Sequence, residues 1–78
     1  MQGIHPLKAY RQNAGITQHE LAELLGVSRT TVARWESGTR KVETDRLGKI
    51  VDATGIAARD LRPDLARALA HTVKPNAR

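Results

Sequence analysis

A turn of only three residues, Gly26 to Ser28, separates two segments that both carry the signals of a short helix. The first segment spans residues 18–25 and the second spans residues 29–37. Two helices joined by so short a connection must cross at a large angle, and the second then projects as a rod. Gly26 suits the turn because glycine adopts a positive φ without strain. The chain is therefore expected to present one short helix outward on a helical scaffold.

The ends of both segments carry residues that satisfy free backbone groups. Thr17 and Glu20 have the spacing of a capping box at the start of the first helix. Ser28 is a good N-cap for the second helix, and Gly38 is placed to end it. The apolar residues of both helices recur at helical spacing, and the stripe expected to be buried comprises Leu21, Ala22, Leu24, Leu25, Val32 and Trp35.

Helical signals continue on both sides of this pair. Pro6 suits the first turn of a helix over residues 6–13, and Gly15 is placed to end it. Thr44 can cap a fourth helix that Gly55 ends. The apolar face of this fourth helix is expected to comprise Leu47, Ile50, Val51 and Ala53.

The segment after the fourth helix is less regular. Residues 57–61 are compatible with one helical turn or two. Pro63 must begin a helix or break one, and a break is the favoured interpretation. Helical spacing then resumes at Leu65, Ala66, Leu69 and Val73. The sequence thus predicts an all-α fold, a compact bundle of about five short helices. We expect one domain over residues 1–73, followed by a polar tail at residues 74–78.

The composition excludes several other classes of protein. The 78-residue chain has no cysteine, so it forms neither a disulfide framework nor a zinc site built on thiolates. No segment approaches the roughly 18 apolar residues that span a bilayer. The scattered His5, His19 and His71 are expected at the surface without a metal. With no Gly-rich phosphate loop and no nucleophile beside a general base, neither a cofactor nor an enzymatic activity is expected.

The charge of the chain favours an anionic partner. Thirteen Lys and Arg against eight Asp and Glu give a net charge of +5. Cations gather between positions 29 and 49, as Arg29, Arg34, Arg40, Lys41, Arg46 and Lys49. The acids of the same stretch are Glu36, Glu43 and Asp45. Because an α-helix fits the major groove of B-DNA, a projecting helix in a basic stretch indicates double-stranded DNA as the partner.

The stretch TQHELAELLGVSRTTVARWESGTRK resembles the helix-turn-helix of the Cro and phage-repressor family of bacterial and phage regulators. The small Ala22, the turn Gly26 and the apolar Val32 match key positions of that family. The resemblance covers residues 7–51, and the segment TGIAARDLRPDL is similar to a subset of Cro-like and antitoxin-type regulators. It implies a lambda-repressor-like fold and a cytoplasmic, sequence-specific regulator of transcription, expected to be a repressor.

The resemblance also implies which residues meet DNA. Base edges are expected to be read from the outward side of the helix over residues 29–37, by Arg29, Thr30, Ala33 and Arg34. An arginine reaches both acceptors of a guanine, a threonine offers a hydroxyl or a methyl group, and an alanine can touch a thymine methyl. Phosphate contacts are expected at Gln18, Ser28, Thr31, Thr39, Arg40 and Lys41.

Two further positions are open to two interpretations each. Similar regulators pair an arginine of the first helix with a glutamate that closes the reading helix, which implies an ion pair between Arg11 and Glu36. Otherwise Arg11 is an ordinary solvated residue. The spacing of Trp35 from Val32 favours the core, the alternative being an aromatic side chain that stacks on a base.

Besides DNA, a second copy of the chain is an expected partner. One reading helix covers few base pairs, so a homodimer on an imperfect palindrome is expected. Its interface, unless the leucines fold back onto their own domain, is expected at Leu61, Leu65 and Leu69. Glu20 and Glu23 are expected on a solvated face, with contact to RNA polymerase as the alternative. The alternative function is that of an antitoxin, whose residues 59–73 would bind a toxin.

Overall fold

A computed structural model describes residues 4–72, and side chains as far as residue 68, as helices joined by short connections. The helices are α1 (Pro6–Ala14), α2 (Gln18–Leu25), α3 (Arg29–Ser37), α4 (Thr44–Thr54), α5 (Ala58–Leu61) and α6 (Pro63–Thr72). Residues 4–72 contain no strand, which confirms the all-α prediction. Val73 and the tail at residues 74–78 lie outside the described residues. Among residues 4–72, no helix is long and apolar enough to cross a membrane.

The pair α2 and α3 is fixed by local hydrogen bonds at its helix starts. Thr17 and Glu20 form the expected capping box, with N···O distances of 2.8 and 3.1 Å. The Ser28 hydroxyl accepts from the backbone N–H of Thr31 at 3.1 Å. Gly26 has a φ of +72°, and a Cβ there would lie 2.8 Å from Lys49 Nζ. The positive φ favours glycine at this position, whereas the Lys49 side chain could move away from a Cβ.

The start of α4 differs from the expected one, and the cap of α1 was not predicted. Thr44 is the first residue of α4, and Glu43 occupies the capping position without a side-chain capping bond in the described structure. His5 is half-buried and caps α1, because its Nδ1 accepts from the backbone N–H of Leu7 at 3.1 Å. Burial lowers the pKa of His5, against the opposing effect of the Glu36 charge. The lowered pKa favours the neutral imidazole that this cap needs.

The core is built from one tryptophan and aliphatic side chains, which come from α1 to α5 and from the connection before α4. Its members are Leu7, Leu21, Ala22, Leu25, Val32, Trp35, Val42, Ile50 and Leu61. Leu24 and Ala53, expected in buried stripes, are exposed, Leu24 to 47%. Both lie at helical spacing from buried residues, but the apolar face of each helix is narrower than the spacing suggested. Leu61, expected at a dimer interface, is instead buried in the core of its own chain.

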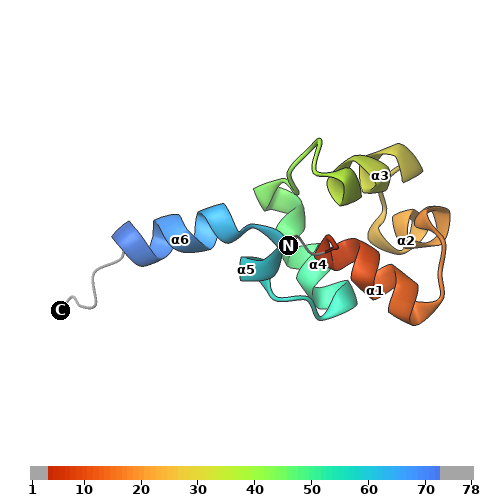
Figure 1. Cartoon of the computed structure of the whole chain (residues 1–78), viewed down its shortest axis with the longest axis horizontal. Coiled ribbons are helices and arrows are strands. Elements are labelled where there is room, and N and C mark those ends of the chain that lie inside the picture. The colour runs from red at the N-terminus through yellow and green to blue at the C-terminus, as the bar shows by residue number, and fades with distance from the viewer. Residues whose placement is uncertain (1–3, 73–78) are drawn as a thin grey trace.

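The arrangement of the helices leaves two elements prominent (Figure 1). Helices α1 to α5 form the body, with α3 beside α2 at its edge. Arg62 interrupts the chain between the single turn of α5 and α6, and Pro63 is the first residue of α6. The helices within residues 4–72 number six, in agreement with the predicted bundle of about five. From Pro63 onward α6 extends away from the body. The body thus presents α3, and a separate helix leaves it on another side.

Candidate nucleic-acid interface

The outward side of α3 carries the four residues expected to read bases. Val32 and Trp35 of this helix are fully buried, and they fix which side faces the protein. Arg29, Thr30 and Arg34 are exposed, and Ala33 is partly buried. Positions 29 and 33, and positions 30 and 34, are one helical turn apart and so share a face. Within residues 4–72 the Arg34 side chain has no hydrogen-bonding partner, so its guanidinium is free to meet a ligand.

The acid of α3, Glu36, is turned away from this outward face. Arg11 of α1 holds it with two hydrogen bonds, from Nε to Oε2 at 3.0 Å and from Nη2 to Oε1 at 3.1 Å. The side chains are 4% exposed for Glu36 and 16% for Arg11. This ion pair, which the resemblance implies, ties α3 to α1. It also leaves the outward face of α3 with cations and no carboxylate.

The pKa of Glu36 reflects two opposed effects of this position. Desolvation by burial raises the pKa, whereas the hydrogen bonds from Arg11 and Gln18 and the charges of Arg11 and Lys8 lower it. The lowering effects prevail, so the pKa lies below its ordinary value. Because the charged carboxylate is the form that accepts both donors, the pair persists at neutral pH.

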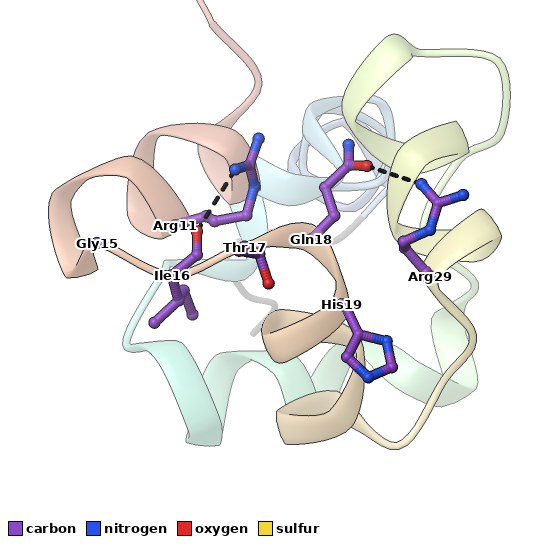
Figure 2. A pocket seen from close by; sticks show the side chains of 7 residues that line it. All are labelled: Arg11, Gly15, Ile16, Thr17, Gln18, His19 and Arg29. Atoms are coloured by element: carbon purple, nitrogen blue, oxygen red, sulfur yellow. Dashed lines mark hydrogen bonds between the residues drawn. The ribbon is translucent and has the colours of Figure 1, made fainter.

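Gln18, at the start of α2, connects this ion pair to the reading face. Its Nε2 donates to Glu36 Oε1 at 3.1 Å, and its Oε1 accepts from Arg29 Nη1 at 3.4 Å. Figure 2 shows the Gln18 amide reaching toward Arg29 across the start of α2. A line of hydrogen bonds thus runs from α1 to the first residue of α3. This line restrains the Arg29 side chain before any ligand is bound.

The start of α2 borders an open hollow of about 670 Å³ that reaches from Arg11 to Arg29 (Figure 2). The first backbone N–H groups of a helix have no acceptor within the helix, and the helix dipole adds a partial positive charge. At α2 these groups belong to Gln18 and His19, both on the rim of the hollow. A phosphate at this point would meet backbone donors, with the charge of Arg11 nearby on the rim of the hollow.

The other expected phosphate ligands have partners within the chain. Ser28 and Thr31 share a hydrogen bond of 2.9 Å, and Thr39 shares one of 2.8 Å with Ser37. The two cations of the segment after α3 are each paired with an acid. Arg40 pairs with Glu43, three residues further along the chain, and Lys41 pairs with Asp64. All these side chains lie at or near the ends of α3.

A cluster around Arg62 was not predicted from the sequence. Arg62 Nη1 donates to the backbone carbonyl of Val42 at 2.7 Å, and its Nε and Nη2 donate to the two carboxylate oxygens of Asp64 at 3.0 Å each. The hydrogen bond from Arg62 and the neighbouring cations hold the pKa of Asp64 well below its ordinary value, although burial opposes them. Neither helical spacing nor a capping pattern links residues 20 positions apart, so only the folded chain reveals the cluster.

Comparisons with known proteins agree with this geometry. The family model described as "Helix-turn-helix" matches residues 7–61, which is more than half of the chain and includes α2, the turn and α3. No curated protein and no solved structure matches the chain. Proteins of the matched family bind DNA and regulate transcription, and they are not normally enzymes. This chain belongs to the helix-turn-helix family, in its Cro and phage-repressor branch.

Proposed function

We propose that the protein is a transcriptional repressor that places α3 in the major groove of a palindromic operator. The observation that carries this proposal is the outward face of α3, where Arg29 and Arg34 stand without a carboxylate beside them. A helix of this size fits the groove, and both guanidinium groups can make the bidentate contact that recognises guanine. Thr30 and Ala33 complete the face, and they favour contacts to base hydrogen-bonding groups or to a thymine methyl.

Phosphates on both sides of the groove would fix the position of α3. At one side, the first backbone N–H groups of α2 face the hollow beside Arg11, where a phosphate would sit. At the other side, Thr39, Arg40 and Lys41 follow the end of α3. Such contacts set the register of a protein on the duplex without reading its sequence. A bound repressor of this kind would act by occupying promoter DNA in the cytoplasm of a bacterium.

Selection of bound sequences from random duplex DNA tests the proposal and supplies an operator for further work. On that operator, Arg34→Ala and Arg29→Ala should each weaken binding by about 1 to 3 kcal/mol and relax the preference at one base pair. Lys41→Ala should weaken binding to every duplex similarly and reduce the slope of affinity against salt concentration by about one. Equal losses for all three variants on selected and unrelated DNA would contradict the reading roles.

A second copy of the chain is the proposed partner on the operator. A hollow of about 280 Å³ with an almost wholly apolar lining lies between α4 and α6, beside Leu47, Leu65 and Ala66. Of the three leucines expected at the interface, Leu61 is part of the core, and Leu65 is the one whose described side chain lines this hollow. The side chain of Leu69 lies outside the described residues. We place the dimer contact at this hollow and along α6.

Sedimentation with and without the selected duplex tests the dimer. Two protomers should bind each full operator, with half-site centres about 34 Å apart, so that both α3 helices enter successive major grooves. Leu65→Glu should weaken the second binding event, because it places a charge in an apolar contact. Leu24→Glu, at an exposed leucine of α2, is the matched control. A single protomer on a full palindrome at protein excess would contradict the dimer.

A further inference from the structure

Asp64, in the first turn of α6, lies between two cationic side chains that differ in how far they are exposed to solvent. Arg62 donates a hydrogen bond of 3.0 Å to each of the two carboxylate oxygens. The Arg62 side chain is only 13% exposed and also donates to the Val42 carbonyl. The carboxylate therefore has a fixed position. On its other side, Lys41 Nζ approaches Asp64 Oδ2 at 3.4 Å from a side chain that is 71% exposed. Of the two cations, Lys41 is the one whose side chain is exposed enough to move from Asp64 to another anion.

We propose that Asp64 restrains DNA binding, because it holds the Lys41 ammonium and competes with the DNA phosphate for it. This inference rests on the proposed function, in which Lys41 meets the backbone of the duplex. A carboxylate and a phosphate present similar anionic oxygens to an ammonium, so the lysine exchanges one for the other on binding. The free protein thus keeps Lys41 occupied, and Asp64 lowers its affinity for every duplex.

The size of the effect follows from the exposure of the contact. An exposed ion pair contributes about 0.2 to 1 kcal/mol, so its loss on binding reduces affinity by roughly one and a half- to fivefold. Exchange also changes the salt dependence of binding. A lysine that neutralises a phosphate releases about one counterion, but a carboxylate left unpaired attracts a cation from solution and offsets part of that release. Asp64 should therefore make the salt dependence shallower.

Asp64 and Glu43 both pair with cations of the connection after α3, but they belong to different parts of the chain. Glu43 pairs with Arg40 from within the same connection, three residues away. Asp64 belongs to α6, 23 residues from Lys41. The contact therefore links α6, the helix that extends away from the body in Figure 1, to a lysine of the connection that follows α3. Any event that displaces the start of α6 would change how readily Lys41 is released.

Asp64→Asn tests the proposal, with Asp60→Asn as the control. Asp60 is an exposed acid of α5, and its replacement changes the net charge by the same amount. Affinity for a short mixed-sequence duplex is measured at several salt concentrations. Asp64→Asn should bind roughly one and a half- to fivefold more tightly at low salt, with a salt slope steeper by up to about one. Asp60→Asn should change affinity by less and leave the slope as in the wild type.

A Lys41→Ala background separates the proposed exchange from other effects of the substitution. There, Asp64→Asn should no longer raise affinity beyond the change caused by Asp60→Asn, since the lysine that it would release is absent. An equal gain in both backgrounds would assign the effect to Arg62 or to overall charge, and would overturn the proposal. Equal gains from Asp64→Asn and Asp60→Asn in the native background would overturn it too.

A measurement on the unmodified protein keeps the test independent of the stability of the variants. The side-chain carboxyl ¹³C resonance of Asp64 should shift when the duplex is added, and that of Asp60 should not. An unchanged Asp64 resonance in a saturated complex would overturn the proposal. A protein that binds no duplex at all would instead contradict the proposed function, so the two failures are distinguishable.

Discussion

Replacement of Trp35 by alanine is expected to destabilise the protein by about 3 to 5 kcal/mol. The side chain is 0% exposed and is the largest in a core otherwise made of aliphatic residues, so its removal leaves a cavity that neighbouring helices cannot fill. A small domain has a total stability of about 5 kcal/mol or somewhat more, so the substitution should remove a large part of it and lower the unfolding midpoint strongly. Circular dichroism during thermal and urea unfolding measures the change.

Two control variants make this expectation specific. Trp35→Phe should cost less, because the buried indole Nε1 has no hydrogen-bonding partner within the described part of the chain and phenylalanine keeps much of the apolar contact. Leu24→Ala, at a leucine that is 47% exposed, should change stability by a small fraction of the loss in Trp35→Ala. A Trp35→Ala protein that keeps its unfolding midpoint but loses DNA affinity would instead place the indole on the binding surface.

Arg11→Ala is expected to cost about 3 kcal/mol of stability, the low end of the range for a broken buried ion pair. The substitution leaves Glu36, with a side chain 4% exposed, without its cation. It also removes the anchor of the hydrogen bonds that lead through Gln18 to Arg29, so affinity for the operator should fall in the molecules that stay folded. Chemical unfolding and operator titration measure the two effects separately. Removing both charges, in Arg11→Met with Glu36→Leu, should recover much of the stability, because no buried charge is then left alone.

The pH dependence of stability provides a further check on this pair. The pKa of Glu36 is lowered in the folded protein, so the stability that its charge contributes is fully present above the ordinary value of 4.5. That contribution is lost as the pH falls through the lowered pKa. The stability difference between the wild type and Glu36→Gln should therefore be constant at neutral pH and shrink in acid. A difference that grows in acid would contradict a charged Glu36 in the folded state.

The helices α1 to α4 could be predicted because their signals are local. A capping box at Thr17, an N-cap at Ser28 and glycines after the helices act over a few residues, and the observed bounds agree with them. The capping position of α4 was missed because Glu43 makes no side-chain capping bond in the described structure, so the sequence favoured Thr44. Where a capping interaction is absent, the adjacent Thr is the more convincing candidate by residue type alone.

The sequence did not predict which apolar side chains are buried within their own chain, or which distant residues pair. Leu61 and Leu65 lie at helical spacing, yet the first is in the core and the second is only partly buried. Spacing identifies an apolar face, but it does not tell whether the same chain or another covers that face. The pairing of Lys41 with Asp64 joins residues 23 positions apart, and no local pattern encodes it. The resemblance to known regulators supplied the pair of Arg11 and Glu36, which spacing alone would not have suggested.

The hydrogen bonds of Gln18 limit which type of side chain can occupy this position. Its side chain donates to a carboxylate at one end and accepts from a guanidinium at the other. Glutamate of the same length could only accept when ionised, and lysine or arginine could only donate. Deamidation of Gln18 would therefore keep an acceptor for Arg29 but replace the donor to Glu36 by a second carboxylate oxygen. Among side chains of this length only an uncharged amide serves both neighbours, so hydrolysis of one amide bond would turn the hydrogen bond between α2 and α3 into a repulsion between like charges.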